Sequence, residues 1–203
     1  MALADKSYQL AMDVLARNAR SDAERELNNA LLQVADHIPS IAALSRLYLE
    51  DARIDAAEKL LAPALNAHAE VLELRQLMAR TKLAAGDAAQ ALQLLDARQP
   101  DIAAHTDYYA MVAALAQQLG QFQKAADHYR ALLARNATQP AWWLGLALAL
   151  DNLTHHSDAA DAYRRALSIS SDTANTLPLA ARNFAQQRLS ALGQSVSVPG
   201  AGS

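Results

Sequence analysis

Residues 106–139 read TDYYAMVAALAQQLGQFQKAADHYRALLARNATQ, and residues 140–173 continue with PAWWLGLALALDNLTHHSDAADAYRRALSISSDT. Aligned with each other, the two segments place alanines, large apolar residues and aromatic residues at corresponding positions, 34 residues apart. The same spacing reaches back toward the start of the chain, where an alanine recurs at every step: Ala23, Ala57, Ala91, Ala125 and Ala159. A constant period of this length is typical of a protein built from one repeated supersecondary unit.

Two further sets of positions keep the same register. Four residues after each alanine comes a large side chain, at Leu27, Leu61, Leu95, Tyr129 and Tyr163. Upstream of each alanine a large residue precedes a small one, at Leu10-Ala11, Leu44-Ser45, Met78-Ala79, Val112-Ala113 and Leu146-Ala147. Small side chains let two helix axes approach closely, and the large ones fill the space beside them. The pattern therefore predicts two packed helices in each repeat.

The period and the pattern resemble the tetratricopeptide repeat, a helix-turn-helix unit, and Trp143 matches the tryptophan of its first helix. The resemblance implies an all-α fold, a right-handed superhelix of about five such repeats. We expect the repeats at 4–37, 38–71, 72–105, 106–139 and 140–173. A capping helix over 177–192 closes a single solenoid domain of residues 1–193, and residues 194–203 are predicted to be a disordered tail.

Residues at the predicted turns support the helix pairs. Gly86 and Gly120 lie where a first helix must end, and glycine adopts the left-handed C-cap conformation at little cost. Ser21 and Asp55 are each followed three residues later by glutamate, which predicts N-caps for two second helices. The corresponding turn of the last repeat, Thr154-His155-His156, contains no glycine and departs from the pattern.

Composition excludes several classes of protein. The 203 residues include no cysteine, which excludes disulfides and thiol catalysis. With 18 Lys and Arg against 21 Asp and Glu, the net charge is -3, and we expect no nucleic-acid partner because phosphates require a basic surface. No apolar run approaches the roughly 18 residues of a membrane-spanning helix, so this segment is not expected to insert into a membrane.

No group of residues predicts catalysis or a cofactor. Asp151 and Asp158 carry no mark of a general acid and base pair, and no phosphate-binding loop or GxSxG motif occurs. The histidines lack the i,i+4 pairing of a metal-binding helix, and we interpret all six as surface side chains: His37, His68, His105, His128, His155 and His156. We expect a protein that is not an enzyme and holds no metal or cofactor.

The tryptophan pair is the most conspicuous local feature. Trp143 occupies an interior position of the repeat and is predicted to lie in the core. Trp142 then lies on another face, where it either packs on the preceding helix or serves as an exposed binding anchor.

The second half of the chain resembles a particular family. Trp142-Trp143-Leu144-Gly145, the run AYRRAL at 162–167 and the run QQRLSAL at 186–192 look like the C-terminal region of the MshN family of MSHA (mannose-sensitive haemagglutinin) type IV pilus biogenesis proteins. The resemblance implies a protein of the Gram-negative inner membrane, with one spanning helix upstream and these repeats in the periplasm. A cytoplasmic location is the alternative.

A binding groove is predicted on the concave side, which stacked repeats line with their first helices. The expected groove residues are Met12, Arg46, Leu49, Gln76, Leu77, Arg80, Met111, Gln117 and Leu148. They suit an extended peptide or amphipathic helix with apolar anchors and an acidic group. The alternative is packing on the terminal helix or self-association with a second copy, because contiguous exposed apolar surface is uncommon on monomers.

The two arginines of this groove allow two interpretations. Arg46 and Arg80 occupy the same position in consecutive repeats, so both should face one stretch of the groove. Either Glu50 and Glu73 neutralise them, or the pair binds a carboxylate of a partner segment.

The predicted function is a non-enzymatic scaffold for protein partners, which the family resemblance implies are pilus-assembly components. The alternative is a cytoplasmic tetratricopeptide repeat adaptor or co-chaperone that clamps a peptide carboxylate. Such clamps use Lys and Asn where this chain has Met12 and Arg46, which disfavours that alternative.

Overall fold

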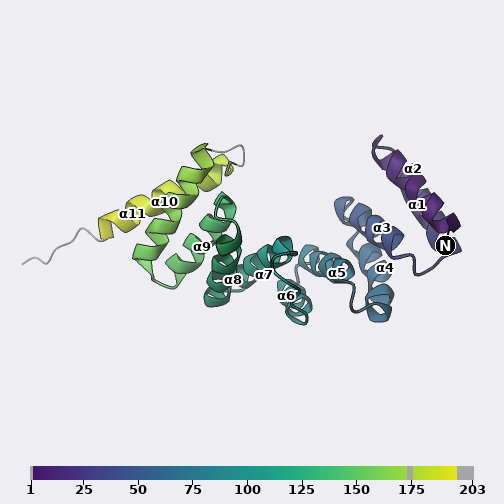
Figure 1. Cartoon of the computed structure of the whole chain (residues 1–203), viewed down its shortest axis with the longest axis horizontal. Helices are drawn as coiled ribbons and strands as arrows, with labels where there is room; N and C mark the ends of the chain where they lie inside the picture. The colour runs from purple at the N-terminus through teal and green to yellow at the C-terminus, as the bar shows by residue number, and fades with distance from the viewer. Residues whose placement is uncertain (1, 173–175, 196–203) are drawn as a thin grey trace, which may run out of the picture. The chain divides into compact units, whose positions relative to one another are not determined.

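In the computed structural model, which describes residues 2–172 and 176–195, all regular structure is helical (Figure 1). Ten helices form five pairs: α1 (Ala2–Leu15) with α2 (Arg20–Gln33), α3 (Ile38–Glu50) with α4 (Ile54–Ala67), α5 (Leu72–Ala84) with α6 (Ala88–Asp96), α7 (Thr106–Gln118) with α8 (Phe122–Arg135), and α9 (Pro140–Asn152) with α10 (His156–Asp172). The last helix, α11 (Leu179–Ser195), follows them. The prediction of an all-α fold made of helix pairs is confirmed.

The chain divides into two compact units, Met1–Arg98 and Gln99–Ser203. In the first unit α2 packs on α3 and α4 packs on α5, and in the second unit α8 packs on α9 and α10 packs on α11. Within each unit the second helix of one repeat thus contacts the next element. The single solenoid domain predicted for residues 1–193 extends beyond either unit and stays a prediction.

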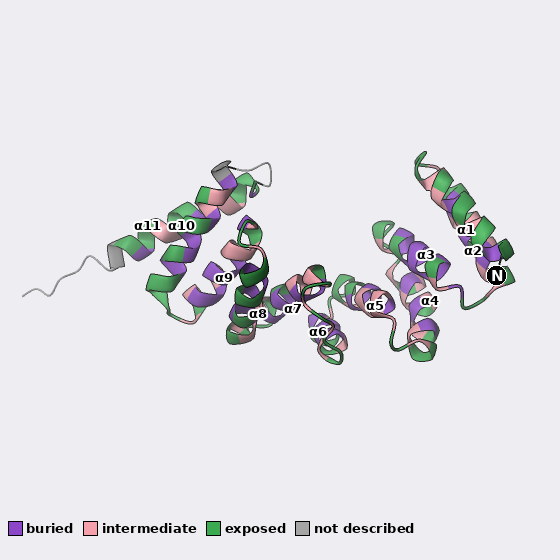
Figure 2. Ribbon diagram, in the orientation of Figure 1, coloured by how far each residue is buried: buried purple, intermediate pink, exposed green. Residues whose placement is uncertain are grey.

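The small residues that set the period form the seams between helices. Every one of the five periodic alanines, Ala23 to Ala159, has 0% of its surface exposed, and so do the small residues of the first helices, such as Ala11, Ser45 and Ala79. Figure 2 shows buried and exposed residues alternating along the helices. Each fully buried leucine beside a seam contributes about 1.5–3 kcal/mol, so the seams and their neighbours form the core.

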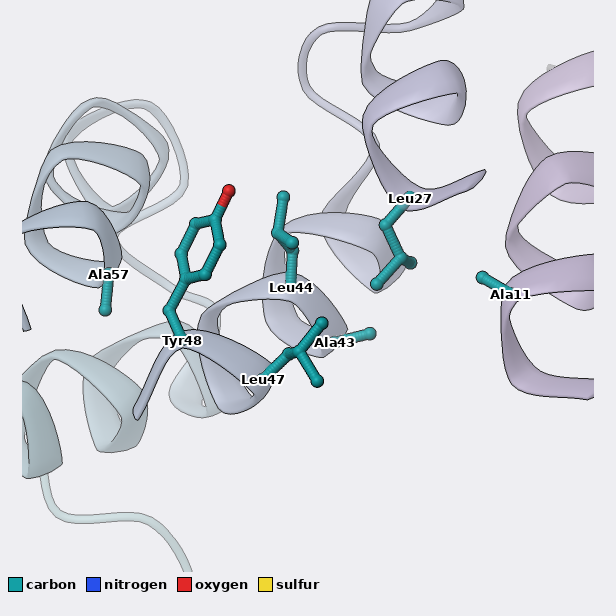
Figure 3. Close-up of a cluster of buried hydrophobic side chains, with 7 residues drawn as sticks. All are labelled: Ala11, Leu27, Ala43, Leu44, Leu47, Tyr48 and Ala57. Carbon is teal, nitrogen blue, oxygen red and sulfur yellow. The ribbon is translucent and has the colours of Figure 1, made fainter. Parts of the chain in front are cut away.

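Figure 3 shows one such cluster, in which α3 contributes most of the side chains. Leu44, Leu47 and Tyr48 of α3 pack between Leu27 of the preceding repeat and Ala57 of α4. All four helices of the first two repeats, α1 to α4, therefore contribute to one cluster. This sharing explains how a repeat too small to bury its own apolar face becomes stable.

Each of the five turns inside a repeat contains one residue with a left-handed backbone. These residues are again 34 positions apart, and they have φ between 56° and 86°: Asn18, Ala52, Gly86, Gly120 and Thr154. In the last repeat Thr154 N–H donates to the Asp151 carbonyl at 3.0 Å and His155 N–H donates to the Leu150 carbonyl at 2.9 Å. This double closure is the Schellman arrangement, so the glycine-free turn keeps the geometry of the others.

The predicted N-caps are wrong. Ser21 and Asp55 lie inside the first turns of α2 and α4, which begin at Arg20 and Ile54 without a side-chain cap. The backbone closure after the left-handed residue starts the second helix about a residue earlier than the side chains suggest. In the third repeat Asp87 does act as a cap, because its carboxylate accepts from Gln90 N–H at 2.9 Å.

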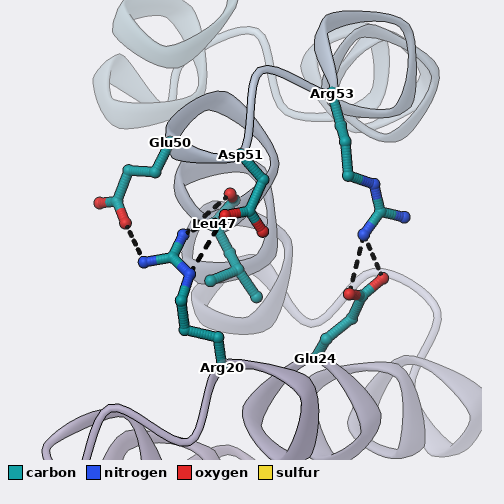
Figure 4. A network of polar contacts seen from close by, with 6 residues as sticks. All are labelled: Arg20, Glu24, Leu47, Glu50, Asp51 and Arg53. Carbon is teal, nitrogen blue, oxygen red and sulfur yellow. Dashed lines mark hydrogen bonds and ion pairs between the residues drawn. The ribbon is translucent and has the colours of Figure 1, made fainter.

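Charged side chains clamp the first two repeats together (Figure 4). Arg20 at the start of α2 contacts Glu50 at 2.8 Å and Asp51 at 2.7 Å, at the end of α3. In the opposite direction Arg53 reaches both carboxylate oxygens of Glu24 at 2.8 Å and covers the ring of Tyr48. These ion pairs are mostly solvent-exposed and therefore individually weak. Together they hold the turns of the first two repeats in position relative to each other.

His37 corrects the interpretation of all histidines as surface side chains. It is 7% exposed, with Nδ1 at 2.7 Å from the Ser40 hydroxyl and Nε2 at 3.1 Å from the Asp5 carboxylate. The ring of Tyr8 lies against it edge-on. His37 thus connects α1 to the start of α3, a tertiary contact that sequence spacing does not reveal.

The capping helix is shifted from its predicted bounds of 177–192. Leu177 precedes α11, is buried, and donates its N–H to the Ser170 hydroxyl at 2.7 Å. Gln194 and Ser195, predicted to belong to the tail, are the last residues of α11. The rest of the predicted tail, residues 196–203, lies outside the described residues.

Replacing Thr154 with glycine should stabilise the protein. A β-branched residue at φ of 62° is strained, and a left-handed conformation costs roughly 1–2 kcal/mol for residues other than glycine. We expect Thr154→Gly to raise the free energy of unfolding by about 1 kcal/mol, measured by urea denaturation. The reciprocal change, Gly120→Thr, should lower it by a similar amount, and equal stabilities of all three proteins would contradict the strain.

Candidate functional site

Four of the predicted groove residues meet in one hollow of the first unit. Arg46 on α3 and Gln76, Leu77 and Arg80 on α5 line a space of about 230 Å³ together with Glu73. We call this space the arginine hollow. The structure thereby supports the register argument that placed both arginines on one face of consecutive first helices.

Charge in the arginine hollow is only partly neutralised. Arg46 forms an ion pair with Glu73, whereas Glu50, the other predicted partner, pairs with Arg20. Arg80 has no ion-pair partner within the described part of the chain and is exposed. The hollow therefore keeps one positive charge that is available to an anionic group.

Leu77 does not act as a free anchor in this hollow. It is 3% exposed and belongs to a core cluster with Ile41 and Leu74, so it forms the floor. Met12 and Leu49 are half-buried against the core of the first unit, and Met111 on α7 is half-buried without lining a described hollow. The sequence places these side chains on the correct helices, but it does not show which of them belong to the core and which line the groove.

A larger hollow lies in the second unit, and its lining is mostly apolar. It measures about 700 Å³ and is formed by α7, α8, α9 and the start of α11, which meet at Gln117, Tyr129, Leu148 and Ala181. We call it the apolar hollow. It unites Gln117 and Leu148 of the predicted groove, and the chain's own Leu177 and Pro178 border it. Packing against the terminal helix, the alternative from the sequence, thus applies to one edge of this space.

Gly145 and Tyr129 determine the depth of the apolar hollow. The ring of Tyr129 lies so close to Gly145 that an added Cβ would be 2.3 Å from Tyr129 Cζ. Tyr129 is 7% exposed, and burial raises the pKa of its hydroxyl to about 12, so the side chain stays neutral. The sequence pattern places Tyr129 beside the helix seam. Its contact with Gly145 in the apolar hollow follows from the missing side chain at position 145.

Asp151, near the end of α9, anchors the terminal helix α11. Its two carboxylate oxygens accept from Arg188 Nε at 2.8 Å and Nη2 at 2.9 Å, and Oδ2 accepts from the Tyr163 hydroxyl at 3.3 Å. The Arg188 guanidinium lowers the pKa of Asp151. Burial, with Asp151 as a second cause, raises the pKa of Tyr163. Arg188 is half-buried in this contact.

Trp143 is less buried than predicted. Trp143 is half-buried, not in the core: its indole N–H donates to the Ala137 carbonyl at 2.8 Å, and the Arg165 guanidinium lies 5.0 Å from its ring centroid. The hydrogen bond to the loop holds the indole toward the surface. Trp142 is also half-buried.

The described residues offer neither a metal site nor a membrane-spanning helix. Over the described ranges no cluster of three or more His, Asp or Glu side chains is placed to hold a metal ion. Among the same residues, no helix combines the length and apolarity that crossing a bilayer requires.

Comparison with solved structures identifies the fold. MamA superposes with a TM-score of 0.72 over 88% of this chain and 99% of its own, at 15% identity. YrrB, described as a tetratricopeptide repeat protein with an unusual peptide-binding site, gives 0.74 over 89% and 90% at 14% identity. PilF of Pseudomonas aeruginosa gives 0.70 over 96% and 90% at 17% identity.

The chain has the tetratricopeptide repeat fold. No model of a protein family matches its sequence, and no curated protein sequence matches it significantly. The tetratricopeptide resemblance is thus supported by structure, and the narrower resemblance to the MshN family is not confirmed.

The Asp151–Arg188 contact should make stability depend on pH. Because the folded-state pKa of Asp151 is lowered, its contribution is complete above the unfolded value of about 4 and is lost as pH falls through the folded value. Asp151→Asn should cost about 1–2 kcal/mol at neutral pH, since Arg188 is partly exposed. The difference between wild type and variant should shrink in acid.

Chemical denaturation at neutral and acidic pH measures this difference. The matched control is Asp161→Asn, which removes an exposed ion pair with Arg164 and should change stability little at either pH. A cost of Asp151→Asn that is the same at both pH values would contradict the assignment.

Removing Arg80 should weaken recognition of acidic ligands without affecting stability, since Arg80 has no ion-pair partner to lose among the residues that the structure describes. We expect Arg80→Ala to keep the wild-type melting temperature and to abolish any preference for a capped peptide containing aspartate over its asparagine analogue, measured by fluorescence anisotropy at low and high salt. Arg135→Ala on α8 removes the same charge from an exposed position outside the arginine hollow and should retain the preference. An unchanged preference in Arg80→Ala would exclude a carboxylate-binding role.

Proposed function

We propose that this chain is a non-enzymatic scaffold that docks protein partners on its first helices during type IV pilus biogenesis. The observation that carries the proposal is the apolar hollow, which presents Leu148, Tyr129 and small residues on α7 and α9. A concave surface of this size, apolar with a few amides, suits a segment of another protein. The arginine hollow adds a cationic point in the first unit.

The pilus assignment rests on two likenesses. The residues around Trp142 and Gly145 resemble the MshN family, and PilF of Pseudomonas aeruginosa shares the fold over most of both chains. By the same resemblance we place the repeats in the periplasm, anchored to the inner membrane by an upstream segment. Alkaline phosphatase fused to the natural gene product tests this location, because the enzyme is active only after export.

A cytoplasmic peptide-binding adaptor is the second candidate. It is favoured by the likeness to YrrB, whose description includes a peptide-binding site, and by the uncompensated charge of Arg80. The pairing of Arg46 with Glu73 counts against a clamp that uses both arginines.

Partner capture with matched variants tests the scaffold. Ala114 and Ala131 are both exposed on helices of the second unit, but only Ala114 lines the apolar hollow. From solubilised inner membranes, wild type and Ala131→Arg should enrich pilus-assembly proteins, identified by mass spectrometry. Ala114→Arg should lose them, because a long charged side chain then occupies the hollow.

Equal capture by both variants would show that the apolar hollow is not the docking surface. Enrichment of proteins unrelated to pili would contradict the pilus assignment while leaving a scaffold role.

A further inference from the structure

The lining of the apolar hollow is almost free of charge. Tyr129 is the one ionisable side chain among its lining residues, and it is neutral at physiological pH. The polar groups are amides, contributed by Gln117, Gln118 and Asn152. A charged side chain that entered would lose hydration without gaining an opposite charge. The hollow therefore discriminates in favour of uncharged ligands, in contrast to the arginine hollow.

One of these amides lacks a partner. Gln117 Oε1 is enclosed and accepts no hydrogen bond from the described residues, a state that costs free energy for a buried acceptor. Gln117 lines the hollow and the terminal torsion of glutamine is broad, so the side chain can rotate to present this oxygen to a bound ligand. Asn152 differs, because its Nδ2 already donates to the Leu148 carbonyl at 2.8 Å. Gln117 is thus an amide acceptor that the described residues leave for a ligand donor.

The shape of the hollow favours main chain as that donor. Ala114 and Ala141 at its rim and Gly145 at its floor are small, which allows a ligand backbone to approach closely. The N–H groups of a helical ligand are already used within the helix, whereas an extended segment has free N–H groups along its length. An extended segment also alternates its side chains, so one apolar side chain can point to the floor.

We propose that the apolar hollow binds an extended, uncharged segment of a partner protein, with a main-chain N–H donated to Gln117 Oε1 and an apolar side chain against Tyr129 and Gly145. The inference rests on the proposed function only in taking a protein segment as the ligand. It specifies what the hollow recognises: absence of charge and an exposed backbone amide. The neutral Tyr129 hydroxyl, which has no hydrogen-bond partner in the described part of the chain, is placed to donate to a ligand carbonyl.

A set of four capped peptides tests this recognition. The parent is acetyl-Gly-Ser-Ala-Val-Leu-Ala-Val-Ser-Gly-amide with a fluorophore. Two analogues carry aspartate or lysine in place of the central leucine, and the fourth has that leucine N-methylated, which removes one N–H. By anisotropy the parent should bind about tenfold more tightly than either charged analogue. N-methylation should weaken binding about threefold to tenfold, the usual effect of one hydrogen bond.

The identity of the acceptor is tested by Gln117→Leu. In this variant the parent and the N-methylated peptide should bind equally, because the acceptor is absent. Gln118→Leu is the matched control: Gln118 borders the same hollow but is exposed, so the variant should keep the sensitivity to N-methylation. Amide NMR spectra of the full chain should show the parent peptide shifting Gln117, Gly145 and Leu148.

Three results would overturn the inference: a charged analogue that binds as tightly as the parent, an N-methylation effect that persists undiminished in Gln117→Leu, or no NMR shifts at the hollow with any of the peptides. Failure of the scaffold proposal is separately visible. If Ala114→Arg loses pilus proteins while a charged peptide is preferred, only the inference falls. If capture is unaffected by Ala114→Arg while the peptides behave as expected, the pilus scaffold falls and the recognition chemistry stands.

Discussion

The close approach of helices at fully buried small residues is the constraint on which the structure depends. A larger side chain at Ala125 or Ala159 would separate two helices that also carry the core leucines and tyrosines of the repeat. Because the neighbouring repeat packs on the same helices, a seam also determines how the next pair is placed. Within each of the two units, the fixed spacing of these residues, 34 positions, therefore sets the position of one first helix relative to the next, and the hollows form on those helices.

Polar contacts refine an arrangement that apolar seams produce. Arg20, Arg53 and His37 each connect one repeat to the next in the first unit, and Arg188 fixes the terminal helix by a bidentate contact with Asp151. The partners of Arg20, Arg53 and Arg188 are carboxylates at or near helix ends, where the chain turns. Charge is therefore mostly used for assembly in this chain. Arg80 is an exception, which makes its position in the arginine hollow informative.

The sequence was sufficient for the helix pairs and their register, because seams need small residues and the period repeats this need five times. It also placed Arg46 and Arg80 on one surface. Other features depend on distances between residues far apart in the chain, and periodicity carries no information on them. The burial of His37 requires Asp5 to be near, the exposure of Trp143 follows from the Ala137 carbonyl, and the anchoring role of Asp151 follows from Arg188. That Leu77 belongs to the core and not to the groove also depends on such distances.

Gly145 has counterparts at the same register in the other repeats, namely Gln9, Ala43, Leu77 and Met111. Where Leu77 stands, the side chain itself fills the space and joins the core; where Gly145 stands, a neighbouring ring enters and a hollow remains above it. The side chain at this position thus decides what forms the floor of a hollow: the leucine itself in the arginine hollow, and the ring of Tyr129 beside Gly145 in the apolar hollow. A repeat array can in this way change the depth and the lining of a binding surface by a single codon change.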